Sequence, residues 1–263
     1  MLREQASLTI DQVATALECS LSKVSRIETG HVKATPRDVR DMLELYRVNG
    51  VQRDELIQLA RDARERGWWT RFGDSASRIE LLVGLETEAT RVSEFHVLVV
   101  PGLLQTREYA EAIFRAFDPE LDDDAIQPRV ELRLARQEIL EQDQPLQLHV
   151  ILDESVLRRS VGGRKVMREQ LEHLLERARW PNIKVQVLPF DRGEHTAILG
   201  SFTLLRFEPA GRHPDVVYIE TEADDLYLEQ PDELRRYTAV FDRLQASALD
   251  AIASRQLIQR FLR

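Results

Sequence analysis

Residues Thr9–Glu28 read TIDQVATALECSLSKVSRIE and predict two short helices joined by a tight turn. The first helix carries apolar side chains at helical spacing, namely Ile10, Val13, Ala14 and Leu17. The second carries Val24 and Ile27 at the same spacing, and Ser20 precedes it as a candidate N-cap. Ala14 is a small residue at the point where two helices would cross closely. The stretch therefore predicts a compact helical hairpin with one buried face on each helix.

The outer face of the second predicted helix is polar. Ser22, Lys23, Ser25 and Arg26 are left pointing outward when Val24 faces the core. A short rigid helix with polar and cationic side chains on its free face fits the major groove of DNA. Spacing alone leaves a second interpretation open, a generic helical hairpin that binds nothing.

The net charge of −9 is unevenly distributed along the chain. Residues 1–66 carry 11 basic and 11 acidic side chains, so the whole net charge belongs to residues 67–263. Residues 18–37 hold a local excess of two positive charges. Charge alone therefore does not establish DNA binding, and an acidic second domain would confine the contact to the small N-terminal face.

Composition bounds the remaining possibilities. A chain of 263 residues, 43% hydrophobic and 31% charged, is long enough for two globular domains with real cores. The single cysteine, Cys19, excludes an internal disulfide and a cysteine-based zinc site. No apolar run approaches the roughly 18 residues of a membrane span, and no signal peptide opens the chain. We expect a cytoplasmic protein without a metal or cofactor and without membrane contact.

Residues 1–66 predict an all-α unit. Leu2–Gln5 is the end of a first helix, which stops before Ser7. Thr35 and Pro36 begin a fourth helix as N-cap and first helical residue. Gln52–Arg66 is a fifth helix with apolar residues on one side.

Residues 67–263 predict an α+β domain with a mixed sheet of about five strands. A helix is expected from about Arg78 to Ser93, followed by the short apolar run Val97–Val100. Alternating or continuous apolar runs predict the strands, which are residues 146–152, 183–188, 201–207, 216–220 and 226–228. Further helices are expected up to Phe117 and over residues 125–142, 164–179, 231–248 and 254–262.

Two sets of residues carry a resemblance to known families. The fragment Val24–Gly30, VSRIETG, is similar to the end of the recognition helix in Xre/Cro/C1-type helix-turn-helix transcription regulators. The remainder resembles the C-terminal domain of actinobacterial regulators of the WhiJ type. The matching blocks are VPGLLQT at 100–106, LRLARQ at 132–137, LDE at 152–154, VGG at 161–163, VLPF at 187–190, GSFTLL at 200–205, VYIE at 217–220 and DLYLE at 225–229.

This resemblance implies a sequence-specific regulator that binds double-stranded DNA as a homodimer, with residues 1–66 on the DNA and residues 67–263 in a regulatory role. The positions that match base-facing residues of the family are Leu21, Ser22, Lys23 and Ser25. The positions that match contacts to the DNA backbone are Arg26, Thr29 and Lys33.

Three departures from the family pattern are visible in the first domain. Glu18 holds the turn position that is usually Gly, so a non-Gly residue is expected at positive φ. Ile10 replaces a frequent phosphate-binding Gln. The first helix is a stub, which predicts a weakened core for the small domain.

A row of arginines in the second domain is a candidate ligand or partner site. Arg129, Arg133 and Arg136 lie at i, i+4 and i+7, on one helix face. One interpretation is an anion clamp. The other is a solvated face paired with neighbours such as Glu131 and Glu138.

Two loops are weaker candidates. Residues 101–106, which include Gln105, open a helix whose free N–H groups could hold a polar ligand, or they form a turn with core leucines. His195 either lines a pocket or is merely exposed in its loop.

The functional hypotheses differ in the role of the second domain. The first is a transcription regulator whose C-terminal domain senses a small-molecule effector or a partner. The alternative is an antitoxin-like interaction module that binds a small companion protein and autoregulates its operon. An enzyme has no positive support, because the chain lacks a Gly-rich phosphate loop, a Ser-His-Asp arrangement and a Cys nucleophile.

Overall fold

The computed structural model describes residues 2–28, 34–62, 67–76, 79–208, 214–221 and 224–263. The chain divides into two compact units, Met1–Trp68 and Trp69–Arg263, and each has its own hydrophobic core. No helix in the described ranges combines the length and the apolar character that a membrane span needs.

The first unit is all-α, as predicted. Its helices are α1 (Leu2–Gln5), α2 (Ile10–Ala16), α3 (Leu21–Glu28), α4 (Pro36–Leu45) and α5 (Gly50–Asp62). Val13 and Ala14 of α2 pack against Val24 of α3 and Met42 of α4 in the centre of this unit. Thr35 is the N-cap of α4 with Pro36 at the first helical position, as expected. The predicted fifth helix begins two residues earlier, at Gly50.

Three helices of this unit end on a left-handed residue that is not glycine. Ser7 after α1, Glu18 after α2 and Arg47 after α4 have φ values of 57°, 50° and 57°. The positive φ expected at Glu18 is thus confirmed. After α2, Glu18 N–H donates to Thr15 O (3.2 Å) and Cys19 N–H donates to Ala14 O (2.9 Å). This Schellman pattern satisfies the last carbonyl groups of the helix, and it forces the left-handed conformation on Glu18.

The second unit is built on a mixed sheet, as predicted, with six strands instead of about five. The strands are β1 (Arg91–His96), β2 (Gln147–Asp153), β3 (Ile183–Leu188), β4 (Phe202–Arg206), β5 (Val216–Glu220) and β6 (Asp225–Leu228). Their order is β3-β2-β1-β4-β5-β6. β1, β2 and β3 run parallel, whereas β4 is antiparallel to β1 and the later pairs are also antiparallel.

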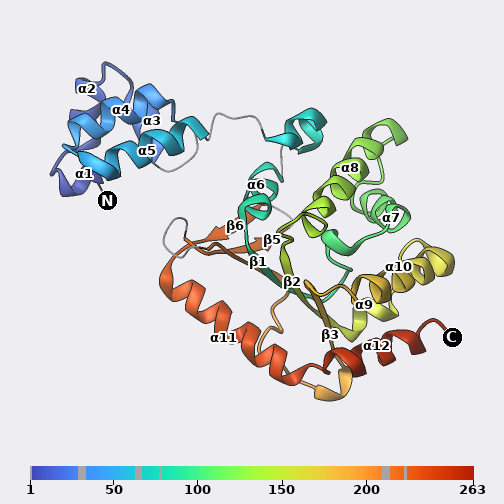
Figure 1. Ribbon diagram of the computed structural model, residues 1–263. Helices are drawn as coiled ribbons and strands as arrows, with labels where there is room; N and C mark the ends of the chain where they lie inside the picture. The colour runs from blue at the N-terminus through green and yellow to red at the C-terminus, as the bar shows by residue number, and fades with distance from the viewer. Residues whose placement is uncertain (1, 29–33, 63–66, 77–78, 209–213, 222–223) are drawn as a thin grey trace. The chain divides into compact units, whose positions relative to one another are not determined.

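Helices cover both faces of this sheet. They are α6 (Glu80–Glu88), α7 (Arg107–Phe117), α8 (Asp123–Arg136), α9 (Glu154–Arg158), α10 (Gly163–Arg177), α11 (Pro231–Ser247) and α12 (Ala251–Arg260). Alternate residues of β1 divide between two cores, because side chains alternate along a strand. Val92 joins the core that includes Tyr109 of α7 and Leu171 of α10. Phe95 joins the core with Phe241 of α11, which runs along the other side of the sheet in Figure 1.

The helix expected from about Arg78 to Ser93 was wrong in its last five residues, 89–93. α6 ends at Glu88, and the central strand β1 follows almost at once. Ser93 and Glu94 interrupt the apolar pattern of this strand although they are only 6% and 5% exposed. Two polar residues side by side are atypical of a strand that is buried on both faces, so the periodicity favoured an exposed helix end.

A half-buried histidine, His149, links the sheet to the segment between α11 and α12. The Nε2 atom of His149 in β2 lies 2.8 Å from Oε1 of Gln186 in β3, and Gln186 Nε2 donates to Leu249 O at 2.8 Å. Gln186 therefore accepts through Oε1, which places the proton of neutral His149 on Nε2. The imidazole ring of His149 also packs against the ring of Phe241 in a T-shaped arrangement, with 5.0 Å between the ring centroids. Burial lowers the pKa of His149 to about 4.

We expect Glu18→Gly to stabilise the first unit by about 0.5–1 kcal/mol. A residue with a Cβ in the left-handed conformation costs roughly 1–2 kcal/mol, which glycine avoids. Glycine also gives the unfolded chain more backbone entropy, which opposes this gain by roughly 0.5–1 kcal/mol. Ala16→Gly, at the last residue of α2, is the matched control and should destabilise by up to about 1 kcal/mol. Hydrogen exchange of the α2 and α3 amides in the full chain measures both effects. A loss of protection in Glu18→Gly would contradict the prediction.

We expect His149 to make the second unit sensitive to acid. Its pKa of about 4 lies below the usual value of 6.5, so the unfolded chain binds more protons, and stability falls as the pH drops from about 6.5 toward 4. Between pH 7 and pH 5 His149 lowers the free energy of unfolding by at most about 2 kcal/mol, and by about 1 kcal/mol once solvent screening is allowed for. Urea unfolding of the wild type and His149→Gln at both pH values measures it. Equal pH dependence in the two proteins would refute this role.

Candidate functional site

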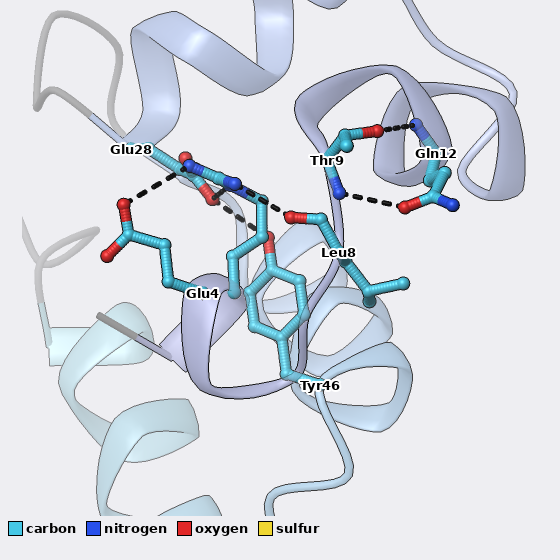
Figure 2. Close-up of polar contacts among 7 residues, drawn as sticks. Glu4, Leu8, Thr9, Gln12, Glu28 and Tyr46 are labelled. Carbon is cyan, nitrogen blue, oxygen red and sulfur yellow. Dashed lines mark hydrogen bonds and ion pairs between the residues drawn. The ribbon is translucent and has the colours of Figure 1, made fainter.

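Each helix of the α2–α3 pair begins with a side-chain N-cap. Thr9 caps α2: its Oγ1 accepts from Gln12 N–H (3.2 Å), and Gln12 Oε1 accepts from Thr9 N–H (2.9 Å), as Figure 2 shows. Ser20 caps α3, as predicted, because its Oγ accepts from Lys23 N–H at 3.1 Å. Each cap satisfies backbone donors that have no partner within the helix. The two helices are therefore well defined in spite of their short length.

The two faces of α3 differ in burial. Val24 is 1% exposed in the core of the first unit. Leu21 is 51% exposed, Ser22 and Lys23 are exposed, and Ser25 is half-buried. The four predicted base-facing positions thus lie at the N-terminal end of α3.

The predicted backbone contacts are less completely described. Arg26 is exposed on α3. Thr29 and Lys33 lie outside the described residues.

Lys23 is held by a carboxylate of the next helix. Its Nζ lies 2.7 Å from Oδ1 of Asp38, and the Lys23 side chain is 46% exposed. The other oxygen of Asp38 accepts from Thr35 N–H (3.1 Å) and Thr35 Oγ1 (2.6 Å) in the capping box of α4. The hydrogen bond to Asp38 raises the pKa of Lys23. Burial raises the pKa of Asp38, but the bonds from Lys23 and Thr35 outweigh it and lower this pKa overall.

The C-terminal end of α3 is tied to α1 and α4 through Glu28. Arg3 Nε donates to both carboxylate oxygens of Glu28, at 3.0 and 2.9 Å. Tyr46 Oη donates to Glu28 Oε1 at 3.0 Å, and Arg3 Nη1 donates to Leu8 O at 2.8 Å (Figure 2). Burial and the Glu28 carboxylate raise the pKa of Tyr46. The short first helix is therefore anchored by charge as well as by packing.

In the second unit, two of the three predicted arginines point inward. Arg136 donates to both oxygens of Glu86, at 2.9 and 2.7 Å, with side chains only 7% and 2% exposed. Arg133 Nη1 donates to Gln105 Oε1 at 2.8 Å, and its guanidinium lies over the ring of Phe114. Burial and the nearby Arg136 lower the pKa of Arg133 to about 10. Burial lowers the pKa of Arg136, but the carboxylates of Glu86 and, to a smaller extent, Glu94 outweigh burial and raise this pKa overall.

The predicted arginine row is thus divided. Arg129 is half-buried on α8 and does not join the contacts of Arg133 and Arg136. Glu131, the expected surface partner, is bound instead to Arg107 of α7 at 2.7 Å.

The segment 101–106 is held by buried glutamines. Gln105 Nε2 donates to Val100 O at 2.6 Å, and Gln137 Nε2 donates to the carbonyls of Gly102 (3.0 Å) and Gln105 (2.8 Å). Thr106 N–H donates to Gln170 Oε1 at 2.8 Å. The polar backbone groups of this turn are therefore occupied by the protein itself, and the Gln105 side chain links the turn to Arg133.

His195 lies apart from these residues. Its ring packs against the ring of Phe95 in a T-shaped arrangement, with 5.4 Å between the ring centroids. Its Nδ1 accepts a hydrogen bond from Ala197 N–H at 3.3 Å. Phe95 belongs to the core on the α11 side of the sheet. His195 therefore contacts the opposite face of the sheet from Arg136.

Sequence reasoning missed Glu86 and Glu94, which are 2% and 5% exposed. Glu86 was expected within the helix from about Arg78 to Ser93 and Glu94 just beyond its end, and neither residue was assigned a role. A carboxylate between Ser93 and Phe95, next to apolar runs, is the one signal that could have indicated a buried charge. Across the described part of the chain, no three His, Cys, Asp or Glu side chains come together in a group that could hold a metal ion.

Known protein families match both units. Residues 1–56 match a family described as a helix-turn-helix domain. Residues 79–260 match a family described as a domain of unknown function, DUF5753. Neither a curated protein nor a solved structure matches the chain.

The first match indicates a DNA-binding regulator, and it covers the helices whose geometry is given above. The second covers more than half of the chain and includes all six strands. The chain therefore belongs to the DUF5753 family and carries an N-terminal helix-turn-helix domain.

Proposed function

We propose that this protein is a sequence-specific DNA-binding transcription regulator in which the exposed face of α3 enters the major groove. The observation that carries the proposal is the contrast between Val24, 1% exposed, and the exposed Leu21, Ser22 and Lys23 on the same helix. A short helix held by its apolar side and free on its polar side can present side chains to base edges.

Each proposed base-facing side chain suits a different feature of the groove. Lys23 can donate to the acceptor atoms of guanine, and Ser22 and Ser25 can donate or accept at either type of base pair. Leu21 offers an apolar surface to a thymine methyl group. Arg26 is proposed to bind a phosphate, together with Thr29 and Lys33. Phosphate contacts position the helix, whereas base contacts select the sequence.

The ion pair with Asp38 modifies the role of Lys23. At 2.7 Å from the carboxylate, the ammonium group uses one of its three donors on Asp38 and keeps the others for a base or a phosphate. The Asp38 carboxylate partly balances the charge of Lys23 and lowers the affinity that Lys23 contributes to specific and non-specific DNA alike.

We further infer that the helix-turn-helix is of the Xre type, that the regulator is WhiJ-like, and that it acts as a homodimer. The support is the resemblance of VSRIETG and of the blocks in the second unit. One α3 helix touches few base pairs, and two copies spaced about 34 Å apart would read a longer site. The second unit is proposed to sense a ligand or partner and to change the spacing of the two copies.

Substitutions of Lys23 and Arg26 should have different effects. We expect Lys23→Ala to reduce discrimination at one base pair by about 1–3 kcal/mol. Arg26→Ala should weaken binding to all sequences equally and lower the salt dependence by about one phosphate contact. Fluorescence anisotropy with the upstream DNA of the gene and its single-base variants measures both. Arg53→Ala, on α5 outside the α2–α3 pair, is the control. Equal affinity of the wild type for the upstream DNA and random duplex at moderate salt would refute the proposal.

Asp38→Asn should strengthen DNA binding. The amide keeps an acceptor for Thr35 but removes the negative charge that holds Lys23. One charge at contact distance in water is worth about 1 kcal/mol, so we expect about fivefold higher affinity at low salt for specific and random DNA alike. Asp41→Asn, on the same helix and paired with Arg37, is the control. Unchanged affinity in Asp38→Asn, at an unchanged melting temperature, would show that Lys23 does not lie near the DNA.

A further inference from the structure

A cavity of about 280 Å³ lies within the second unit, around the C-terminal end of β1. Its lining includes Glu94 and His96 of β1, Arg133 of α8, Thr203 of β4 and Tyr218 of β5. The volume is close to the lower limit for small-molecule pockets in proteins. The cavity therefore has room for a small metabolite, and its wall carries ionisable groups.

The topology of the sheet creates this cavity. β1 pairs with β2 on one side in parallel and with β4 on the other side in antiparallel orientation. The chain leaves β1 toward α7 and α8, while β4 and β5 approach from the other side. In open α/β sheets, ligands bind beyond the carboxyl end of a strand where the strand order reverses. The end of β1 is that position here.

The strand register brings polar side chains to one face. Glu94 lies beside Thr203, and Thr203 lies beside Tyr218. Directly opposed residues in a sheet point to the same face. The row therefore offers a carboxylate, a hydroxyl and a phenol to a single space, on the side of the sheet that also receives Arg133.

Three atoms around the cavity lack a hydrogen-bond partner within the described residues: Glu94 Oε2, His96 Nε2 and Arg133 Nε. The first two lie 3.7 Å apart, which is too far for a hydrogen bond. Glu94 is only 5% exposed and lines this cavity, so a partner for its Oε2 has to lie inside the cavity. Buried polar groups in native proteins are nearly always satisfied, and an unsatisfied charged one points to a molecule that completes it.

The neighbouring charges do not explain these gaps. Arg136 is fully engaged by Glu86, in an ion pair with two hydrogen bonds. Gln105 is engaged by Val100 and by Arg133 Nη1. What remains open is one cationic donor, Arg133 Nε, one anionic acceptor, Glu94 Oε2, and the imidazole nitrogen of His96, 3.7 Å from that acceptor. A ligand that satisfies both charged groups carries an acceptor and a donor on the same molecule, and a carboxylate with an ammonium group makes the strongest such bonds.

We propose that this cavity binds a small zwitterion of amino-acid size, with its carboxylate on Arg133 and its ammonium group on Glu94. Tyr218 and Thr203 supply further hydrogen bonds, and the apolar part of the ligand lies against Leu82 and Val100. The binding site belongs to the second unit and does not require that the first unit bind DNA. Only the effect of the ligand on DNA affinity rests on the proposed regulatory function.

The twenty free L-amino acids are the probes, and calorimetry and thermal unfolding of the full chain are the measurements. Each probe is paired with its N-acetyl derivative, which lacks the ammonium group, and with its amide, which lacks the carboxylate. At least one amino acid should bind and raise the melting temperature, and its two derivatives should fail. No binding by any of the twenty, or equal binding by the derivatives, would overturn the proposal.

Variants of the cavity separate a binding role from a structural one. Glu94→Gln should leave the ligand-free protein as stable or more stable, because it removes a buried carboxylate whose Oε2 has no hydrogen-bond partner among the described residues. It should also weaken the binding of the amino acid at least tenfold. Glu86→Gln is the matched control: it breaks the buried pair with Arg136 and should lower the melting temperature of the ligand-free protein. If Glu94→Gln destabilises as Glu86→Gln does and binding is unchanged, Glu94 is structural and the proposal fails.

A steric variant tests the place of binding. A Cβ on Gly102 would lie 3.7 Å from Arg133 Nε, at ordinary contact distance. Gly102→Ala therefore fits the fold but covers the guanidinium group of Arg133. It should weaken the binding of the amino acid at least tenfold and leave the melting temperature of the ligand-free protein unchanged. Unchanged affinity would place the ligand elsewhere. These titrations contain no DNA, so their failure leaves the proposed DNA binding untouched, and the reverse also holds.

Discussion

A charged side chain that leaves water needs a partner, and both units of this protein are organised by that constraint. In the first unit, Arg3 and Tyr46 satisfy Glu28, which joins α1, α3 and α4. In the second, Arg136 and Glu86 satisfy each other between α8 and α6. The Arg136–Glu86 pair is costly to break, because the remaining charge stays buried, whereas the Glu28 and Arg3 side chains stay 22% and 18% exposed, and water can reach them. The elements that carry such pairs are therefore fixed relative to each other inside each unit.

The sequence predicted what depends on local chemistry. Thr35 and Pro36 begin α4, Ser20 caps α3, and Glu18 takes the left-handed conformation, because neighbouring backbone groups decide each of these features. β1 could not be read in the same way. Its position in the centre of the sheet depends on pairing with β2 and β4, more than 50 residues away for β2 and over 100 for β4, and its polar Ser93 and Glu94 conceal its burial.

The same distinction between local and long-range determinants applies to the candidate sites. The exposed positions of α3 follow from its helical period, so Ser22 and Lys23 could be named from the sequence pattern. Leu21 was named only through the resemblance to the family. The partner of Lys23 could not be named, since Asp38 is brought to it by the packing of α4. Gln105 and Arg133 were each named from the sequence for separate reasons, and the structure joins them by a hydrogen bond. Glu94 has no local signal, because its burial results from strands and helices that surround it from distant parts of the chain.

The charge distribution restricts how such a protein can select DNA. Residues 1–66 carry no net charge, and the rest of the chain is acidic, so long-range attraction to DNA is weak. The Lys23–Asp38 pair removes a further cation from the surface that would meet phosphates. Non-specific binding consists almost entirely of such phosphate attraction, and the same loss of attraction lowers specific binding by a similar amount. The ratio of specific to non-specific affinity therefore depends on the base contacts of α3, and two copies acting together would restore the absolute affinity.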